Sequence, residues 1–290
     1  MSGYIISSGH YCETVSGELP VLKPLVKQAT GVAVRRVGRF IQLALIGAGR
    51  TAKIIPTEAG LYLSSGRGDI EITTQVLNTI YCERQSPRPL DFINTVSNAA
   101  CFYMAQILKI SGPSSFISHR HFSFEVALRS ALLDLQFEVI PMALVGAVDL
   151  VTTPLAEHRQ RLQLEVGQEV AEASHWLQVV NKPDGHEVLA VIEQHQHFSS
   201  QQKLIAWLDQ QVDLPAHLAI GQFADAKSLL SIDALQSCHL VVDEYLPGHF
   251  DSQAGRIFCQ FISSDLPALL YINSDRHDRH IVFVLRRGEH

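Results

Sequence analysis

Residues 110–148 constrain the fold more than any other part of the chain. A Gly112-Pro113 turn precedes a short apolar segment, residues 115–118, that fits a buried strand. An apolar run at residues 139–148 predicts another buried strand. Between them, apolar residues recur at helical spacing: Phe122, Val126, Leu128, Leu132, Leu133 and Leu135. The pattern predicts strand, tight turn, buried helix and strand. The dipole of such a helix favours an anion or a thiolate at its N-terminus.

The composition allows a sizeable core and excludes several classes of function. Of 290 residues, 47% are hydrophobic. The formal charge of -6 argues against a general nucleic-acid binder. No apolar run reaches the ~20 residues that span a bilayer, and no basic segment of a secretory signal opens the chain. Five cysteines have no paired or CxxC spacing: Cys12, Cys82, Cys101, Cys238 and Cys259. We therefore expect a cytoplasmic protein with reduced thiols, no membrane span and no nucleic-acid partner.

Apolar periodicity predicts alternating strands and helices along the rest of the chain. In the first half we expect, by residue number, a strand at 4–8, irregular structure at 10–38, a strand from 60 into a glycine turn at 66–69, a helix at 70–82, an extended linker at 86–91 and an apolar helix at 97–110. Residues 40–48 fit either a strand or a helix. In the second half we expect a crossover at 154–164, strands at 175–180, 188–193 and 239–244, helices at 200–212 and 255–262, and an antiparallel pair at 269–273 and 281–285. Gly66 and Gly68 lack the third glycine of a dinucleotide-binding fingerprint.

The spacing within residues 94–149 is distinctive. Asn94-Thr95-Val96-Ser97-Asn98 precedes Gly112-Pro113-Ser114, His121 follows Ser114 by seven residues, and Gly146-Ala147-Val148-Asp149 ends the second predicted strand. Counted without gaps, the stretch resembles the β-ketoacyl synthases of the thiolase fold. That family has a Ser-Thr-x-x-Asn segment, a Gly-Pro-Ser turn, a nucleophilic Cys seven residues later and a strand ending in a Gly-Gly-Ala-Glu-like element. Where the family has this Cys the chain has His121, and no cysteine lies within ten residues of it.

A second segment resembles the same family, and its surroundings depart from it. His249, in Pro247-Gly248-His249, stands at the family's distance from Gly255 for a catalytic His. The upstream Lys of the family is replaced by residues 243–245, and its His-Gly-Thr-Gly-Thr loop is absent from residues 216–239. The C-terminal Gly-Phe-Gly-Gly turn is replaced by the bulky, charged residues 275–280. Because that turn approaches the active site in the family, its replacement suggests a filled pocket.

The resemblance implies an α/β protein of the thiolase-like fold, with two pseudo-duplicated halves in an αβαβα layered arrangement. We place an N-terminal half at residues 1–155 and a shortened C-terminal half at residues 156–290, together forming one domain. In the family, the helix at residues 97–110 lies at a dimer interface. Its periodicity fits an ordinary core helix equally well.

A condensing ketosynthase needs a thiolate to carry the acyl chain and two histidines to stabilise the carbanion formed on decarboxylation. A homologue lacking the thiol and one histidine resembles the chain length factors of type II polyketide synthases, most of all the short subunit of aryl polyene biosynthesis. The resemblance implies no catalytic residue, no metal, no cofactor, an active ketosynthase as heterodimer partner, and an acyl carrier protein reached through the complex. The residues expected at the tunnel and interface are Phe92, Thr95, Asn98, Ala99, Phe102 and Tyr103.

Two histidines keep a catalytic alternative open. His121 is either a base or a filler of the space left by the thiol, and His249 is either a residual decarboxylation catalyst or a structural residue. If both act, the chain is a malonyl-carrier decarboxylase or priming factor. A homodimeric relic without an acyl role is a third alternative. Asp243 and Glu244 are either an acid–base pair or a solvated strand edge. With 14 histidines in the chain, close pairs such as His119 and His121 do not by themselves indicate a metal site.

Overall fold

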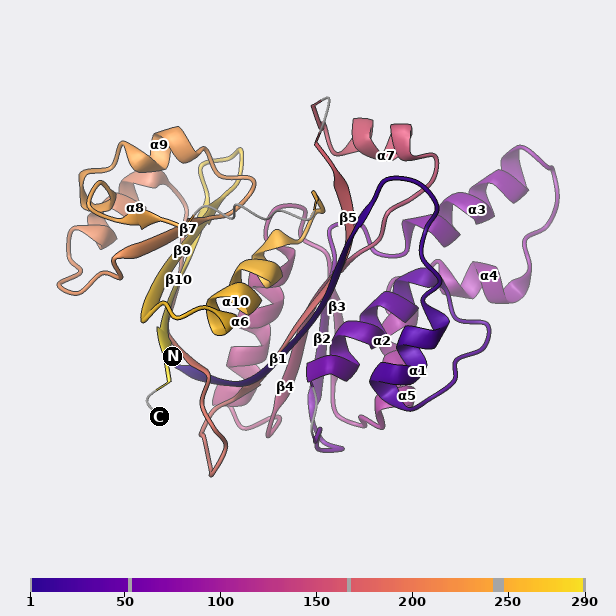
Figure 1. Ribbon diagram of the computed structural model, residues 1–290, viewed down its shortest axis with the longest axis horizontal. Coiled ribbons are helices and arrows are strands. Elements are labelled where there is room, and N and C mark those ends of the chain that lie inside the picture. Colours follow the sequence, from indigo (N-terminus) through magenta and orange to yellow (C-terminus); the bar gives the residue numbers. More distant parts are fainter. Residues whose placement is uncertain (1, 52–53, 166–167, 242–247, 289–290) are drawn as a thin grey trace.

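A single mixed sheet runs through the molecule (Figure 1). The computed structural model describes residues 2–51, 54–165, 168–241 and 248–288. Within these ranges ten strands follow the order β3-β2-β4-β5-β1-β6-β10-β9-β7-β8. The strands are β1 (Gly3–Val15), β2 (Gly60–Ser64), β3 (Ser114–Ile117), β4 (Ala143–Asp149), β5 (Val170–Val180), β6 (Ala190–Phe198), β7 (His217–Ile220), β8 (His239–Leu240), β9 (Ala268–Ser274) and β10 (His280–Arg287). Strands β4 and β5 are buried at every residue, as expected where helices cover both faces.

The strand order repeats. The first five strands are arranged β3-β2-β4-β5-β1, and the last five β8-β7-β9-β10-β6, which is the same order with each number raised by five. The parallel and antiparallel pairings repeat as well. The two sets join where residues 3–5 of β1 pair with residues 190–192 of β6. The pseudo-duplication is therefore present. Because β5 belongs to the first set, the changeover lies between Val180 and Ala190, later than the predicted boundary at residues 155/156.

Helices form three layers around the sheet. They are α1 (Lys23–Thr30), α2 (Arg39–Thr51), α3 (Ile70–Tyr81), α4 (Pro89–Asn94), α5 (Ala99–Leu108), α6 (Ser123–Gln136), α7 (Leu155–Arg161), α8 (Gln201–Leu208), α9 (Ala226–Leu230) and α10 (Gln253–Ser263), with a 3-10 turn η1 (Asp233–Leu235). Figure 1 shows α6 and α10 side by side at the centre, where their apolar faces pack on strands of both halves. Helices α1, α2 and α5 cover the first half, and α8, α9 and η1 cover the second. This is the predicted αβαβα arrangement.

Three segments of the first half differ from the sequence prediction. Residues 40–48 lie in α2, where a Cβ at Gly47 would come within 2.3 Å of the Ser174 Oγ, so glycine permits close packing on β5. The segment predicted as irregular contains the rest of β1 and the whole of α1. Strand β1 continues to Val15 because β5 pairs with it along its length. Helix α4 begins within the predicted linker, at Pro89, because proline is tolerated in a first helical turn, and it continues beyond the linker to Asn94.

Smaller differences concern lengths and burial. The predicted buried strand before α6 is the edge strand β3, whose first two residues are exposed. Strand β8 ends at Leu240, and the rest of that predicted strand, including Asp243 and Glu244, falls largely outside the described residues. Helix α8 ends four residues early, and the predicted crossover contains α7. The helices at 70–82 and 255–262 and the antiparallel pair β9–β10 are confirmed.

Candidate functional site

The candidate site begins at the N-terminus of the buried helix α6. The Oγ of Ser123, the first helical residue, accepts a hydrogen bond of 3.0 Å from the backbone N–H of His119. His121 lies two residues before the helix, at the predicted nucleophile position. Its ring packs edge-on against Phe223, with ring centroids 4.7 Å apart. Burial lowers the pKa of His121, and the charge of Arg120 contributes to the lowering. The imidazole is therefore neutral at pH 7.

His249 is held by its backbone at the start of β5. Its N–H donates to the Glu169 carbonyl at 2.8 Å, and its own carbonyl accepts from the Ala171 N–H at 3.2 Å. Gly248 has a φ of 129°, and a Cβ there would lie 2.6 Å from the Val170 carbonyl carbon, so this turn requires glycine. Burial lowers the pKa of His249, so its ring is also neutral at pH 7. The Gly-His motif found in the sequence is thus a tightly fixed turn.

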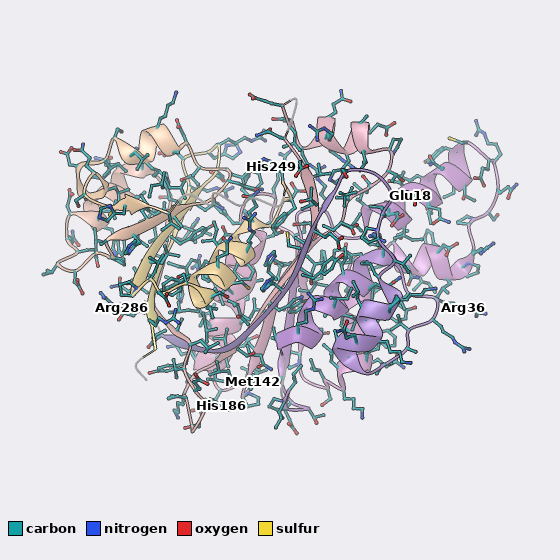
Figure 2. All side chains as sticks on the ribbon, in the orientation of Figure 1. Glu18, Arg36, Met142, His186, His249 and Arg286 are labelled. Atoms are coloured by element: carbon teal, nitrogen blue, oxygen red, sulfur yellow. The ribbon has the colours of Figure 1, made fainter. Side chains whose placement is uncertain are left out.

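One cavity of 690 Å³ brings the two histidines together. His249, labelled in Figure 2, reaches it from just before α10, and His121 from just before α6. The other lining residues are Arg67, Arg120, Arg161, Leu162, Gln163, Leu164, Gln222, Phe223, Phe250, Asp251 and Arg276. The one carboxylate among them, Asp251, accepts from Arg67 Nε at 2.8 Å. The wall is therefore cationic. The sequence did not indicate this, because the four arginines come from separate segments.

Inward of His121 the space is filled. A cavity of only 10 Å³ remains between His121 and the core residues around Glu125. The Glu125 carboxylate is buried and accepts hydrogen bonds of 2.6 Å from the Tyr271 hydroxyl and from Asn273 Nδ2. Asn273 Nδ2 also donates to the His121 carbonyl at 3.0 Å. Burial raises the pKa of Glu125, and the two hydrogen bonds oppose that rise. Residues other than the charged segment 275–280 thus fill this inner side, whereas the 690 Å³ cavity on the other side is open and is lined by Arg276 of that segment.

The Asp149 carboxylate, at the end of β4, connects three segments beside the cavity through hydrogen bonds. Its carboxylate accepts hydrogen bonds from the Ser65 hydroxyl at 2.8 Å, the Gly66 N–H at 3.0 Å and the Ser252 N–H at 2.6 Å. Burial, reinforced by the charge of Asp251, raises the pKa of Asp149 to about 7. The sequence prediction placed Asp149 at a strand end but did not assign it this role. The only sequence signal for the role was its position at the carboxyl end of a strand, where functional residues of α/β sheets gather.

A second region stands apart from the cavity. Helices α3, α4 and α5 contact one another in sequence order, and these helices and the segment between α4 and α5 carry large apolar side chains that are each at least 41% exposed. These are Leu77, Tyr81, Leu90, Phe92, Ile93, Val96 and Phe102, here called the α3–α5 face. Helix α5 also contacts β3, the edge strand, which pairs only with β2 in the described part of the chain. Monomeric proteins rarely expose apolar patches of this kind.

The predicted tunnel and interface residues lie in this second region. Phe92 and Phe102 belong to the α3–α5 face, at 58% and 65% exposure. Thr95 and Asn98 lie between α4 and α5, and Ala99 and Tyr103 are half-buried on α5. None of the six lines the cavity at His121. Helix α5 is not buried all round: Ala100, Cys101 and Met104 face the core, and Phe102 faces out.

The cysteines offer no reactive thiol at the site. None of the five lines the 690 Å³ cavity. Burial raises the pKa of Cys12 to about 11 and those of Cys101 and Cys259 to about 12, so these thiols stay protonated at neutral pH. Among the described residues, no group of three or more His, Cys, Asp or Glu side chains is arranged to hold a metal ion. In the same part of the chain, every helix is too short or too polar to cross a membrane.

No family model and no curated protein matches the chain. Solved structures do match it along its whole length. One is the ishigamide ketosynthase/chain length factor, with a TM-score of 0.75, 14% identity and full coverage of both chains. Another is from AntDE:AntF, a type II polyketide synthase acyl-carrier protein in complex with its ketosynthase bound to the hexaketide, with a TM-score of 0.72, 12% identity and 99% coverage of both chains. A third is a β-ketoacyl synthase from Burkholderia phymatum, with a TM-score of 0.68, 11% identity and 99% coverage of both.

These likenesses show the fold. At identities of 11–14%, matching architecture over whole chains means that the protein has the thiolase-like fold of the ketosynthases, as predicted. They leave the chemistry to the side chains, because one fold supports many functions.

Proposed function

We propose that this protein is a non-condensing ketosynthase homologue that pairs with an active ketosynthase and acts as its chain length factor. The observation that carries the proposal is the α3–α5 face next to the unpaired edge of β3. Obligate interfaces are large, about 2,000 Å² or more, and more apolar than other surfaces. An edge strand beside such a surface also offers backbone N–H and C=O groups to a partner strand.

The chemistry of the site supports a non-catalytic role. A thioester intermediate needs a sulfur nucleophile, and the residue at the predicted nucleophile position, two residues before α6, is His121. No cysteine lines the cavity around it. The polar contacts of Glu125, Tyr271 and Asn273 occupy the space further in, and the cavity of 10 Å³ that remains there supports a role in which this chain holds no acyl group. In this proposal condensation takes place on the partner.

In this proposal the α3–α5 region shapes the partner's acyl tunnel. Phe92, Thr95, Ala99, Phe102 and Tyr103 lie at or beside the proposed interface. A bulky side chain at a tunnel end opposes further extension, because overpacking an interior costs about 1–3 kcal/mol. Such a cost changes the product ratio about tenfold. The acyl carrier protein reaches the complex through the ketosynthase. We infer aryl polyene biosynthesis as the pathway from the sequence resemblance.

Co-expression tests the proposal. The chain is produced alone and with a ketosynthase that has the catalytic Cys and both His residues, chosen from the same gene neighbourhood. We expect a stable 1:1 complex in size-exclusion chromatography with light scattering, and self-association or poor recovery of the chain alone. A monodisperse monomer that forms no complex with any such ketosynthase contradicts the proposal. An acyl group covalently attached to this chain during turnover also contradicts it.

A second candidate function is decarboxylation of a malonyl-carrier thioester. The shared cavity of His121 and His249 favours it, since both rings are neutral and line one space, and a neutral imidazole can donate its N–H to a carbonyl oxygen. It predicts CO2 release from malonyl-carrier protein by this chain alone, lost in His249→Ala. Absence of CO2 release, or release that survives the substitution, removes this candidate.

A further inference from the structure

The 690 Å³ cavity carries more positive charge than either proposed function uses. Of its four arginines, Arg67 is paired with Asp251 at 2.8 Å. Within the described ranges, Arg120, Arg161 and Arg276 form no ion pair with a carboxylate.

Neutral contacts orient the innermost of these arginines. Arg161 Nη2 donates to the Thr152 hydroxyl and lies 3.0 Å from His158 Nδ1. Burial, reinforced by the charge of Arg161, lowers the pKa of His158 to about 4, so that ring is neutral and brings no negative charge to the guanidinium. Burial and the charge of Arg67 lower the pKa of Arg161, and the charges of Asp251 and Glu157 oppose that lowering.

The rest of the wall suits an organic molecule. Leu162, Leu164, Phe223 and Phe250 supply apolar surface between the arginines. The volume of 690 Å³ falls within the range of about 300–1,000 Å³ typical of small-molecule sites. Guanidinium groups present planar pairs of N–H donors that match phosphate oxygens and bind them through two hydrogen bonds at once.

We propose that this cavity binds a small organic molecule bearing a multiply charged phosphate group of the pyrophosphate class. The charge balance selects this class. Three guanidinium groups that form no ion pair within the described ranges carry three positive charges, and the one carboxylate of the wall, Asp251, is already paired with Arg67. The single negative charge of a phosphodiester, as in a carrier's prosthetic arm, neutralises one of them, and a pyrophosphate group neutralises two to three. The site does not depend on pairing with a ketosynthase, because none of its residues belongs to the α3–α5 face.

Isothermal titration of the full chain with inorganic pyrophosphate, at constant ionic strength, tests the proposal. We expect binding at one site per chain. The double variant Arg120→Gln/Arg276→Gln should bind at least about tenfold more weakly, because each charge-assisted hydrogen bond contributes roughly a factor of ten. Both side chains are exposed, so the fold should survive, and thermal melting checks this. The variant Arg35→Gln/Arg36→Gln is the matched control. It removes the same charge from exposed positions, and Figure 2 shows Arg36 well away from His249.

A parallel titration with 4′-phosphopantetheine esterified to a blocked serine, which reproduces the phosphodiester of a carrier's arm, distinguishes a free ligand from that arm. We expect this phosphodiester to bind at least about tenfold more weakly than pyrophosphate. The proposal fails if pyrophosphate does not bind, if both double variants lose affinity equally, or if the phosphodiester binds more tightly. Complex formation with a ketosynthase is measured on the same samples. A chain that pairs but binds no pyrophosphate overturns this inference alone, and a chain that binds pyrophosphate but never pairs overturns the proposed function alone.

Discussion

The two edges of the sheet follow one strand order and end differently. At the edge of the second half, β8 is only two residues long, and Leu229, Ile232 and Leu235 of the preceding segments belong to a buried cluster, although Leu240 stays partly exposed. At the edge of the first half, β3 stands next to the α3–α5 face, where the corresponding apolar side chains are exposed. The two halves of the sheet thus share the same strand order. The helices next to each edge determine whether the apolar side chains there are buried within the chain or are left exposed for a partner to cover.

Removing an apolar side chain at each edge should give the largest contrast. Leu235 at the second edge is fully buried, so Leu235→Ala should lower the free energy of unfolding by about 2–5 kcal/mol. Phe102→Ala at the first edge should change it by less than about 0.5 kcal/mol, because Phe102 is exposed. Urea denaturation of the isolated chain measures both. Equal losses would mean that the first edge also closes on itself.

A charge at the first edge should weaken the proposed pairing. Val96→Asp places a carboxylate in the α3–α5 face and should reduce affinity for the ketosynthase at least about tenfold, since buried interface charges without partners are costly. Val212→Asp is the matched control, because Val212 is fully exposed and lies beyond α8 in the second half. Analytical ultracentrifugation of the mixed subunits gives both affinities. If the Val212 variant also lost affinity for the ketosynthase, the interface would not be confined to the α3–α5 face, contrary to the proposal.

Two aspartates at matching places should respond to pH in opposite ways. Asp149 ends β4, and Asp275 follows β9, which is the fourth strand of the second half. Burial raises the pKa of Asp149 to about 7, so its stabilising contribution is present below about pH 3.8 and is lost as the pH rises through 7. At Asp275, burial acts to raise the pKa, but hydrogen bonds from Arg279 and backbone amides outweigh it and lower the pKa to about 2. That contribution is present above about pH 3.8 and is lost as the pH falls through 2.

Urea midpoints across the pH range check these signs. Asp149→Asn should lessen the loss of stability between pH 4 and 8, and Asp275→Asn should lessen the loss between pH 4 and 2. If Asp149→Asn instead reduced the loss of stability between pH 4 and 2, or Asp275→Asn the loss between pH 4 and 8, the two aspartates would not differ as described.

The smallest effect is expected at the site of the missing nucleophile. In the proposed complex, His121→Ala and His249→Ala should leave pairing and product length unchanged within about twofold, because neither residue belongs to the α3–α5 face. Product analysis by mass spectrometry of the reconstituted complex gives the answer. A change in chain length on either substitution would mean that the cavity, and not the first edge, controls the product.

The sequence predicted the regular elements best where both faces are covered. The spacing from Phe122 to Leu135 identified α6, and a gap-free count placed His121 at its start, because burial fixes both the period and the length of such a segment. Strand β1 was predicted too short because its outer part carries polar residues such as His10 and Glu13, which mask the two-residue period. Helix α4 was missed because Pro87 and Pro89 suggested extended backbone, whereas a proline in the first turn is compatible with a helix.

The cationic cavity was beyond sequence reasoning for a different reason. Arg67, Arg120, Arg161 and Arg276 lie on four loops or helix ends separated by at least forty residues. The ends of β2, β4, β7 and β9 meet near the starts of α6 and α10, and this arrangement brings the four arginines to one wall. Phe223 and Glu125 were likewise unremarkable in the sequence, since their contacts with His121 and Asn273 join the two halves.

The position of β1 in the middle of the sheet has a consequence for biosynthesis. Strand β1 is translated before both of its neighbours, β5 and β6, which begin at residues 170 and 190. Its backbone amides therefore gain their strand partners only after those later residues have been translated. Non-local pairing of this kind slows folding. During that interval an unpaired strand is available to chaperones, and a nascent chain stalled before residue 170 cannot assemble even its first five-stranded unit.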